Sequence, residues 1–134
     1  MIDYQKLVEE AFKMMKYSYS PYSHFTVGAA LLTKDNKIFT GCNIENASYG
    51  PTMCAERTAI FKAVSRGYKE FSAIAIVGGE NGEVKDFCPP CGVCRQVMSE
   101  FCDGDFEIIL ADKIYDWKIY TLDQLLPERF ELKK

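Results

Sequence analysis

The sequence predicts an α/β protein in which helices are layered on one mixed five-stranded sheet. Segments with helical spacing of apolar residues alternate with short apolar segments typical of strands. Their order is helix, strand, strand, helix, strand, helix, strand, strand, which favours helices packed on a single mixed sheet. A length of 134 residues suits one domain with one core, residues 1–134.

The first predicted elements are a helix and a hairpin. Residues 3–17 have apolar side chains at helical spacing, at positions 4, 7, 8, 11, 12, 14 and 15, and Asp3 can cap this helix. The segment "YSPYSH" then breaks it. The segments 25–33 and 37–45 are predicted strands, and "KDNK" between them indicates the turn of a hairpin.

The rest of the chain alternates helices with strands. Residues 54–67 are predicted to form a helix that ends at Gly67, a residue type common just after a helix. Pro127 is expected to stop a last helical turn. The remaining predicted elements are strands at 71–79, 106–112 and 117–122, the last an edge strand, a short helix at 91–102, and the last turn at 123–130.

Composition narrows the classes of function. The formal net charge is −3 with no basic block, so binding of nucleic acid is poorly supported and a small substrate fits better. No apolar run approaches the roughly 20 residues needed to span a bilayer, so no membrane partner is expected. The start, "MIDYQKLVEE", carries acidic residues and does not read as a signal peptide, which predicts a cytoplasmic protein. The six cysteines are then expected to be reduced or metal-bound.

Three cysteines have the spacing of a zinc site. Cys91 and Cys94 would lie one turn apart at the start of a helix, directly after two prolines. The positive end of a helix lowers the pKa of a thiol and favours the metal-binding thiolate. Cys54, at the start of the other helix, is the natural third ligand. Three thiolates favour zinc, and three protein ligands leave a position for water, whose proton Glu56 could handle.

Each motif also has a simpler interpretation. A single C-x-x-C motif also occurs in redox and structural zinc sites, and a helical glutamate next to an arginine is usually a solvated pair. Cys88 adds a second C-x-x-C in "CPPC" and could be an inert spare thiol or a regulatory disulfide partner. "CAE" together with "PCGVC" favours a catalytic site with one zinc ion per chain over a structural site.

Across nearly its whole length the chain resembles the small, all-cysteine, homotetrameric type of zinc-dependent cytidine deaminase. The resemblance rests on "PYSHFTVGAALLT", "GCNIENASY", "CAERTAI", "PCGVCRQ" and "LLPERF", in the family's order. It implies a three-layer α-β-α fold with a central mixed five-stranded sheet. It also implies deamination of cytidine and 2′-deoxycytidine in pyrimidine salvage.

The resemblance also implies residue roles. Zinc held by Cys54, Cys91 and Cys94 would activate a water as hydroxide, which attacks C4 of the pyrimidine, with Glu56 as proton shuttle. Because a Zn²⁺ ion with three thiolates is net negative, positive groups must offset this charge, and Arg57 resembles the family's arginine that hydrogen-bonds the thiolates. The implied substrate contacts are Phe25 on the base, the Ala55 backbone on the base, Asn43 and Glu45 on the ribose 3′-hydroxyl, and Ala47, Tyr49 and Phe130 on a neighbouring subunit's substrate.

Other functions remain possible from the sequence. A deaminase of the same fold could act on a related amino-pyrimidine nucleoside such as blasticidin S, although Phe25, Asn43 and Glu45 favour an unmodified ribose. An enzyme that edits bases within RNA or DNA would need a basic path for the strand, which the acidic balance does not supply. A structural zinc module would need a fourth protein ligand and would give Glu56 no role.

Overall fold

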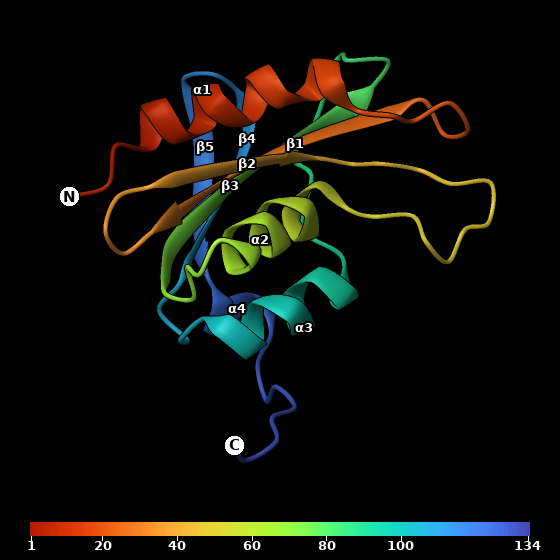
Figure 1. Ribbon diagram of the computed structural model, residues 1–134. Coiled ribbons are helices and arrows are strands. Elements are labelled where there is room, and N and C mark those ends of the chain that lie inside the picture. The colour runs from red at the N-terminus through yellow and green to blue at the C-terminus, as the bar shows by residue number, and fades with distance from the viewer.

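A five-stranded mixed sheet forms the centre of the molecule in the computed structural model, which describes residues 1–134 (Figure 1). The strands lie in the order β2-β1-β3-β4-β5. Only β3 and β4 pair in parallel, and the other neighbours are antiparallel. The elements are α1 (Tyr4–Met14), the 3-10 turn η1 (Met15–Tyr17), β1 (Phe25–Thr33), β2 (Ile38–Cys42), α2 (Ala55–Ser65), β3 (Phe71–Glu80), α3 (Gly92–Phe101), β4 (Glu107–Lys113), β5 (Asp116–Thr121) and α4 (Leu122–Leu125).

Helices cover both faces of the sheet, which confirms the three-layer α-β-α prediction. Helix α1 lies along one face, and α2, α3 and α4 lie on the other (Figure 1). Two buried clusters result because alternate residues of a strand point to opposite faces. The α1 side is filled by residues such as Leu7, Val8 and Ile109, and the other side by residues such as Ile60 and Met98.

Two glycines let the helices approach the sheet closely. A Cβ atom added to Gly28 in β1 would lie 2.0 Å from the carbonyl oxygen of Ala11 in α1. A Cβ added to Gly41 in β2 would lie 2.5 Å from the carbonyl oxygen of Ala55, the first residue of α2. Both positions therefore require glycine for backbone packing, and Gly41 fixes where α2 begins.

The topology brings the starts of α2 and α3 to one edge of the sheet. Because β1 pairs antiparallel with both β2 and β3, these two outer strands run in the same direction and end at the same edge. Helix α2 follows β2 and returns the chain to β3, and α3 follows β3 and returns it to the parallel β4. Each helix must therefore start at this edge, which is where sites form in open α/β sheets.

Several predicted local signals are confirmed. Asp3 caps α1, since its carboxylate accepts a hydrogen bond of 3.1 Å from the Lys6 amide. The hairpin turn lies between β1 and β2, where Asn36 has a positive φ of 66°. Gly67 follows α2 with a φ of 91°, a left-handed conformation that favours glycine. Strand β5 is an edge strand, as predicted.

Three predicted boundaries were wrong. The strand predicted at 37–45 ends at Cys42. The reason is that the next residue, Asn43, accepts a hydrogen bond from the Val27 backbone amide of β1 through its side chain. The first helix changes to a 3-10 turn at Met15. Leu122 starts α4 instead of ending β5, because Thr121 and Gln124 form a capping box there. Helix α4 ends at Leu125, before Pro127.

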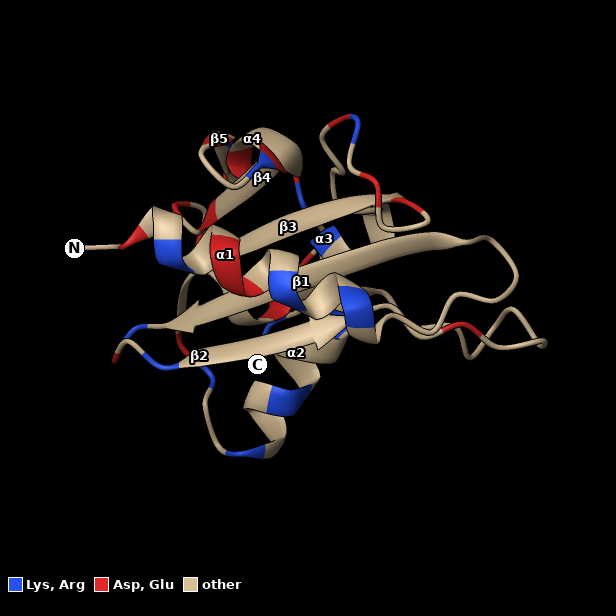
Figure 2. Cartoon of the chain, turned by 90° about the horizontal axis from the view of Figure 1, so that it is seen from above, with Lys and Arg blue, Asp and Glu red and all other residues tan.

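The charged side chains are mixed in sign over much of the molecule. Viewed onto α1, Lys and Arg residues are interspersed with Asp and Glu residues on that helix and on the surrounding loops (Figure 2). Residues of both signs thus occur together on this side of a chain whose formal net charge is −3. None of the helices is both long and apolar enough to cross a membrane.

Candidate active site

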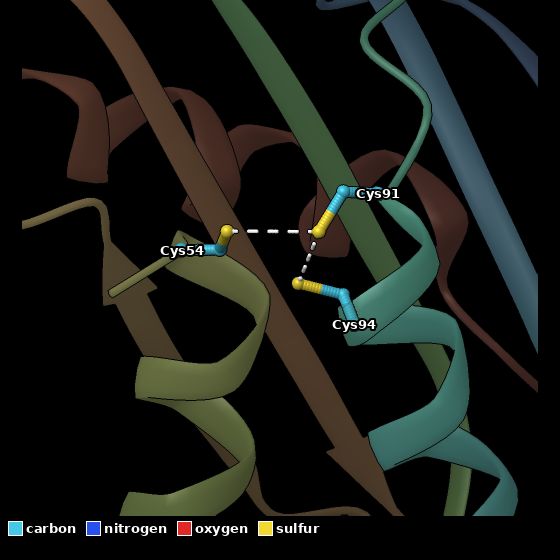
Figure 3. A group of neighbouring side chains, drawn as sticks. All are labelled: Cys54, Cys91 and Cys94. Carbon is cyan, nitrogen blue, oxygen red and sulfur yellow. Dashed lines mark hydrogen bonds between the residues drawn. The ribbon is translucent and has the colours of Figure 1, made fainter. Parts of the chain in front are cut away.

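The three predicted zinc ligands meet where α2 and α3 start. Cys54 is the N-cap residue of α2, Cys91 is the N-cap residue of α3, and Cys94 lies in the first turn of α3. Neither N-cap side chain accepts a capping hydrogen bond from a backbone amide of its own helix. All three sulfur atoms point into the space between the two helices (Figure 3). The positive ends of two helix dipoles therefore face the thiols and favour their ionised forms.

The spacing of the sulfur atoms suits a zinc ion. The Sγ atoms of Cys54 and Cys91 are 3.9 Å apart, those of Cys91 and Cys94 are 3.5 Å apart, and all three lie within 4.8 Å of one another. Tetrahedral zinc with Zn–S bonds of about 2.3 Å places its sulfur ligands about 3.8 Å apart. No fourth His, Cys, Asp or Glu belongs to the group. Three ligands are the number typical of catalytic zinc, whereas a structural site has four.

The pKa values of the Cys54 and Cys94 thiols are shifted in opposite directions. The neighbouring Cys94 thiol and the Arg57 guanidinium lower the pKa of Cys54 to about 5. The Arg57 Nη2 atom lies 3.3 Å from the Cys54 sulfur and donates to it. Conversely, the neighbouring Cys54 sulfur and burial raise the pKa of Cys94, which therefore holds the proton that the two groups share. A cation bound at this site would replace that proton.

Glu56 lies buried beside the cysteines in the first turn of α2, with only 4% of its surface exposed. Burial raises its pKa to about 7, and the Cys54 charge adds to this effect. Its own backbone amide and the Arg57 charge act in the opposite direction. A carboxyl group that exchanges a proton near neutral pH is suited to general acid–base chemistry.

The two arginines near the cysteines have different surroundings. Arg57 contacts Cys54, and its Nε atom is buried without a hydrogen-bond partner. Arg95 instead donates to the carbonyl oxygens of Pro90 at 2.8 Å and Leu125 at 2.7 Å, and so joins α3 to α4. Arg57 is therefore the arginine placed to offset thiolate charge.

Phe25 and Cys88 lie side by side over β3. A Cβ atom added to Gly78 would lie 3.0 Å from the Phe25 ring and 2.9 Å from the Cys88 sulfur. Burial raises the pKa of Cys88 to about 12, with smaller contributions from the charges of Glu56 and Cys54. Cys88 is thus a half-buried thiol beside the Phe25 ring, and its raised pKa keeps it neutral. Cys42 and Cys102 are buried, and all six cysteines are free.

Asn43 and Glu45 bond to the segment that leads into β1. Asn43 is buried at the end of β2. Its Oδ1 atom accepts from the Val27 amide at 2.9 Å, and its Nδ2 atom donates to the Phe25 carbonyl oxygen at 2.8 Å. Glu45 is more exposed and accepts from the Tyr22 and Ser23 amides at 3.0 and 3.1 Å. These two side chains fix the position of Phe25.

The remaining predicted substrate contacts do not join the cysteine group. Tyr49 is 82% exposed and Phe130 is 67% exposed. The loop of Ala47 and Tyr49 and the C-terminal segment of Phe130 leave the body of the molecule in different directions (Figure 1). The Ala55 side chain is fully buried at the start of α2. His24 is exposed in the loop before β1 and is not part of the metal group.

Sequence reasoning did not single out several residues that line a cavity of about 330 Å³ next to Glu45. Its lining comprises Tyr22, Ser23, Glu45, Asn46, Tyr49 and Thr52. Polar residues in a turn are common, so "YSPYSH" and "NASYGPT" carry no local signal that separates a binding wall from an ordinary loop.

A buried carboxyl group beside three thiols, at the shared edge of a mixed sheet with helices on both faces, defines the class of zinc-dependent deaminases. The family model described as "Cytidine and deoxycytidylate deaminase zinc-binding region" matches residues 1–110. The chain therefore belongs to the cytidine and deoxycytidylate deaminase family.

Relatives and solved structures agree with this assignment. The cytidine deaminase of Sporosarcina psychrophila is 48% identical over 129 residues, which cover 96% of this chain and 92% of that protein. The crystal structure of cytidine deaminase from Burkholderia pseudomallei superposes with a TM-score of 0.87 at 46% identity, covering 97% of this chain and 100% of that one. A more distant relative, the blasticidin-S deaminase of Bacillus cereus, is 32% identical over 93% of this chain and 90% of that protein.

Proposed function

We propose that the protein deaminates cytidine and 2′-deoxycytidine hydrolytically to uridine and 2′-deoxyuridine, with release of ammonia, in pyrimidine salvage. One observation carries this proposal: Glu56 is buried next to three cysteines that converge at two helix N-termini. The relatives named cytidine deaminase, which match nearly the whole chain, support the same substrate.

The residues of this chain have separate roles in the reaction. The zinc ion would be held by Cys54, Cys91 and Cys94. When bound, it supplies a Lewis acid that lowers the pKa of water toward neutral pH. Glu56 takes a proton from the attacking water and delivers it to N3 of the pyrimidine as C4 is attacked. It then moves a second proton, from the hydroxyl group now on C4, to the amino group; the C4–N bond breaks, ammonia leaves and the C4 carbonyl of uridine remains. Burial suits Glu56 to both transfers, because a carboxyl group shielded from water exchanges protons directly with the substrate.

Substrate contacts are proposed at the residues that border this site. Phe25 packs on the base, and the Ala55 backbone contacts the base at the start of α2. Asn43 and Glu45 bind the ribose 3′-hydroxyl. The position of Phe25 beside the half-buried thiol Cys88, and the hydrogen bonds of Asn43 to the Phe25 carbonyl oxygen and the Val27 amide, support a fixed aromatic wall for a planar ring.

We further propose a homotetramer with shared active sites. Tyr49 and Phe130 are large and highly exposed, and they project on segments that leave the body of the chain, which supports contacts with neighbouring subunits. In this arrangement Ala47, Tyr49 and Phe130 complete the pocket of another subunit.

The expected mass in solution is about four times the 15.2 kDa of one chain, measurable by sedimentation equilibrium. Mixing unfolded Glu56→Gln and Phe130→Ala chains and refolding them together should give more activity than either variant alone, because some sites then contain both native residues. A monomeric mass, or no gain on mixing, would contradict shared sites.

We also infer that residues 1–134 act as one catalytic domain in the cytoplasm. One sheet supports both buried clusters, which favours a single folding unit. All six cysteines are free, and the cytosol keeps thiols reduced, which supports a cytoplasmic location. Chromatography of tagged protein from fractionated cells tests the location.

The direct test is formation of uridine and ammonia from cytidine by the zinc-loaded protein. Cytidine, 2′-deoxycytidine and blasticidin S are compared under the same conditions by absorbance change and ammonia release. We expect both nucleosides to react with kcat/KM at least about tenfold above that of blasticidin S, the magnitude of one well-placed contact. Turnover of blasticidin S alone would instead favour an enzyme of that second specificity, for which the relative in Bacillus cereus provides a precedent.

A further inference from the structure

The Glu45 carboxylate is held by three hydrogen bonds from one short segment. Its Oε1 atom accepts from the backbone amides of Tyr22 and Ser23, at 3.0 and 3.1 Å. Its Oε2 atom accepts from the Ser23 hydroxyl group. Both carboxylate oxygens are therefore fixed, although Glu45 lies in a loop outside the sheet.

This arrangement leaves little free acceptor capacity. A carboxylate has about four acceptor positions, and three are occupied here. The free position is on Oε2, because Oε1 already accepts two bonds. No lysine or arginine forms an ion pair with Glu45, and the bond from the Ser23 hydroxyl is the largest cause that lowers its pKa. An ionised carboxylate with one open position suits one neutral hydroxyl donor.

The Ser23 hydroxyl is itself oriented by Phe25. The Phe25 backbone amide donates to Ser23 Oγ at 3.0 Å, so the hydroxyl oxygen accepts from β1 while its hydrogen points at Glu45. The turn between them is tied on both sides. The His24 amide donates to the Ser20 carbonyl oxygen at 2.9 Å, and the His24 carbonyl oxygen accepts from the Asn81 amide at 2.6 Å. Ser23 thus connects the proposed base-binding residue with the proposed sugar-binding residue.

We propose that Ser23 is a positioning residue that holds the Glu45 carboxylate with its one open acceptor at the cavity, and thereby sets the preference for nucleosides with a free 3′-hydroxyl. This inference rests on the proposed function, since it concerns how the same site recognises the sugar. Ser23 itself does not touch the reacting atoms. Its effect is expected in substrate binding, and it should depend on the presence of the hydroxyl that Glu45 recognises.

The experiment compares cytidine with 3′-deoxycytidine, which lacks only the 3′-hydroxyl, in wild type, Ser23→Ala and Ser23→Thr. In Ser23→Ala we expect kcat/KM for cytidine to fall about tenfold, mainly through KM, because a hydrogen bond to a charged group is lost. The value for 3′-deoxycytidine should change less than about twofold, since Glu45 has no partner there. Ser23→Thr keeps the hydroxyl and should restore most of the preference.

The control is Ser65→Ala, which removes a serine hydroxyl that donates to the Lys62 carbonyl oxygen in the last turn of α2, at the far end from Cys54. It should leave both substrates unchanged. Equal losses for both substrates in Ser23→Ala, or a fall in kcat with unchanged KM, would overturn the proposal.

Failure of the proposed function gives a different result. If wild-type protein with zinc bound leaves cytidine unchanged, the function is wrong, and the Glu45 carboxyl is then titrated by NMR. A higher Glu45 pKa in Ser23→Ala than in wild type would support the positioning role on its own. An unchanged pKa would overturn it.

Discussion

Replacing Glu56 with glutamine is expected to reduce kcat for cytidine by about 10⁴-fold, the upper range for loss of a general acid–base group. Glutamine has nearly the same shape but cannot take a proton from water or deliver one to N3 or to the leaving amine. The zinc content should stay near one ion per chain, because Glu56 is not one of the three grouped ligands. Uridine formation and zinc content are measured on the same preparation.

The stability of this variant adds a second test. Glu56 is 4% exposed and its pKa is raised to about 7 mainly by burial, so ionising the carboxylate inside the protein is unfavourable. Replacing it with a neutral amide should keep or raise the thermal midpoint. Exposed Glu9 on α1 provides the control, and Glu9→Gln should retain full activity. If Glu56→Gln kept more than about a tenth of the wild-type kcat, well outside the loss expected for a proton shuttle, Glu56 would not have this role.

Replacing Cys94 with alanine is expected to remove zinc and activity together. Cys94 is fully buried between the two helix starts, and its loss leaves two of three sulfur ligands. The zinc content, measured by atomic absorption after dialysis, should fall from one ion per chain to well below half. Activity should fall at least as far as the zinc content, because without the metal nothing lowers the pKa of the attacking water.

Loss of the metal should also lower stability. A ligand present at about 1,000 times its dissociation constant adds roughly 4 kcal/mol to the free energy of unfolding. Chelation of the wild-type protein should therefore lower its denaturation midpoint, whereas chelation of Cys94→Ala should have little effect. Cys102→Ala is the matched control, since Cys102 is also buried but lies outside the group. Equal zinc loss in both variants would argue against the three-cysteine site.

Replacing Arg57 with alanine is expected to weaken zinc binding, but less than the loss of Cys94 does. Its guanidinium donates to the Cys54 sulfur at 3.3 Å and helps lower the pKa of that thiol. Residues that orient and neutralise metal ligands typically change metal affinity by about 10- to 100-fold when removed. Competition with a zinc chelator should therefore rank Arg57→Ala between wild type and Cys94→Ala.

Local sequence signals predicted most elements because their causes are local. The Asp3 cap, the left-handed Gly67 and the hairpin turn each depend on residues within a few positions of one another. The boundary at Cys42 could not be predicted in this way. It depends on hydrogen bonds of Asn43 to Phe25 and Val27, which lie 18 and 16 positions away and become neighbours only when the sheet forms.

The sequence by itself determined the chemistry of the candidate site. Residue type and the first-turn spacing of Cys91 and Cys94 specify soft ligands at a helix start, and Cys54 and Glu56 supply the third thiol and the carboxyl group. Only the tertiary structure decided that these parts meet, since β2 and β3 must end at the same edge for α2 and α3 to start together. It also decided the burial of Glu56 and the hydrogen bond from Ser23 to Glu45, because both depend on packing between segments far apart in the chain.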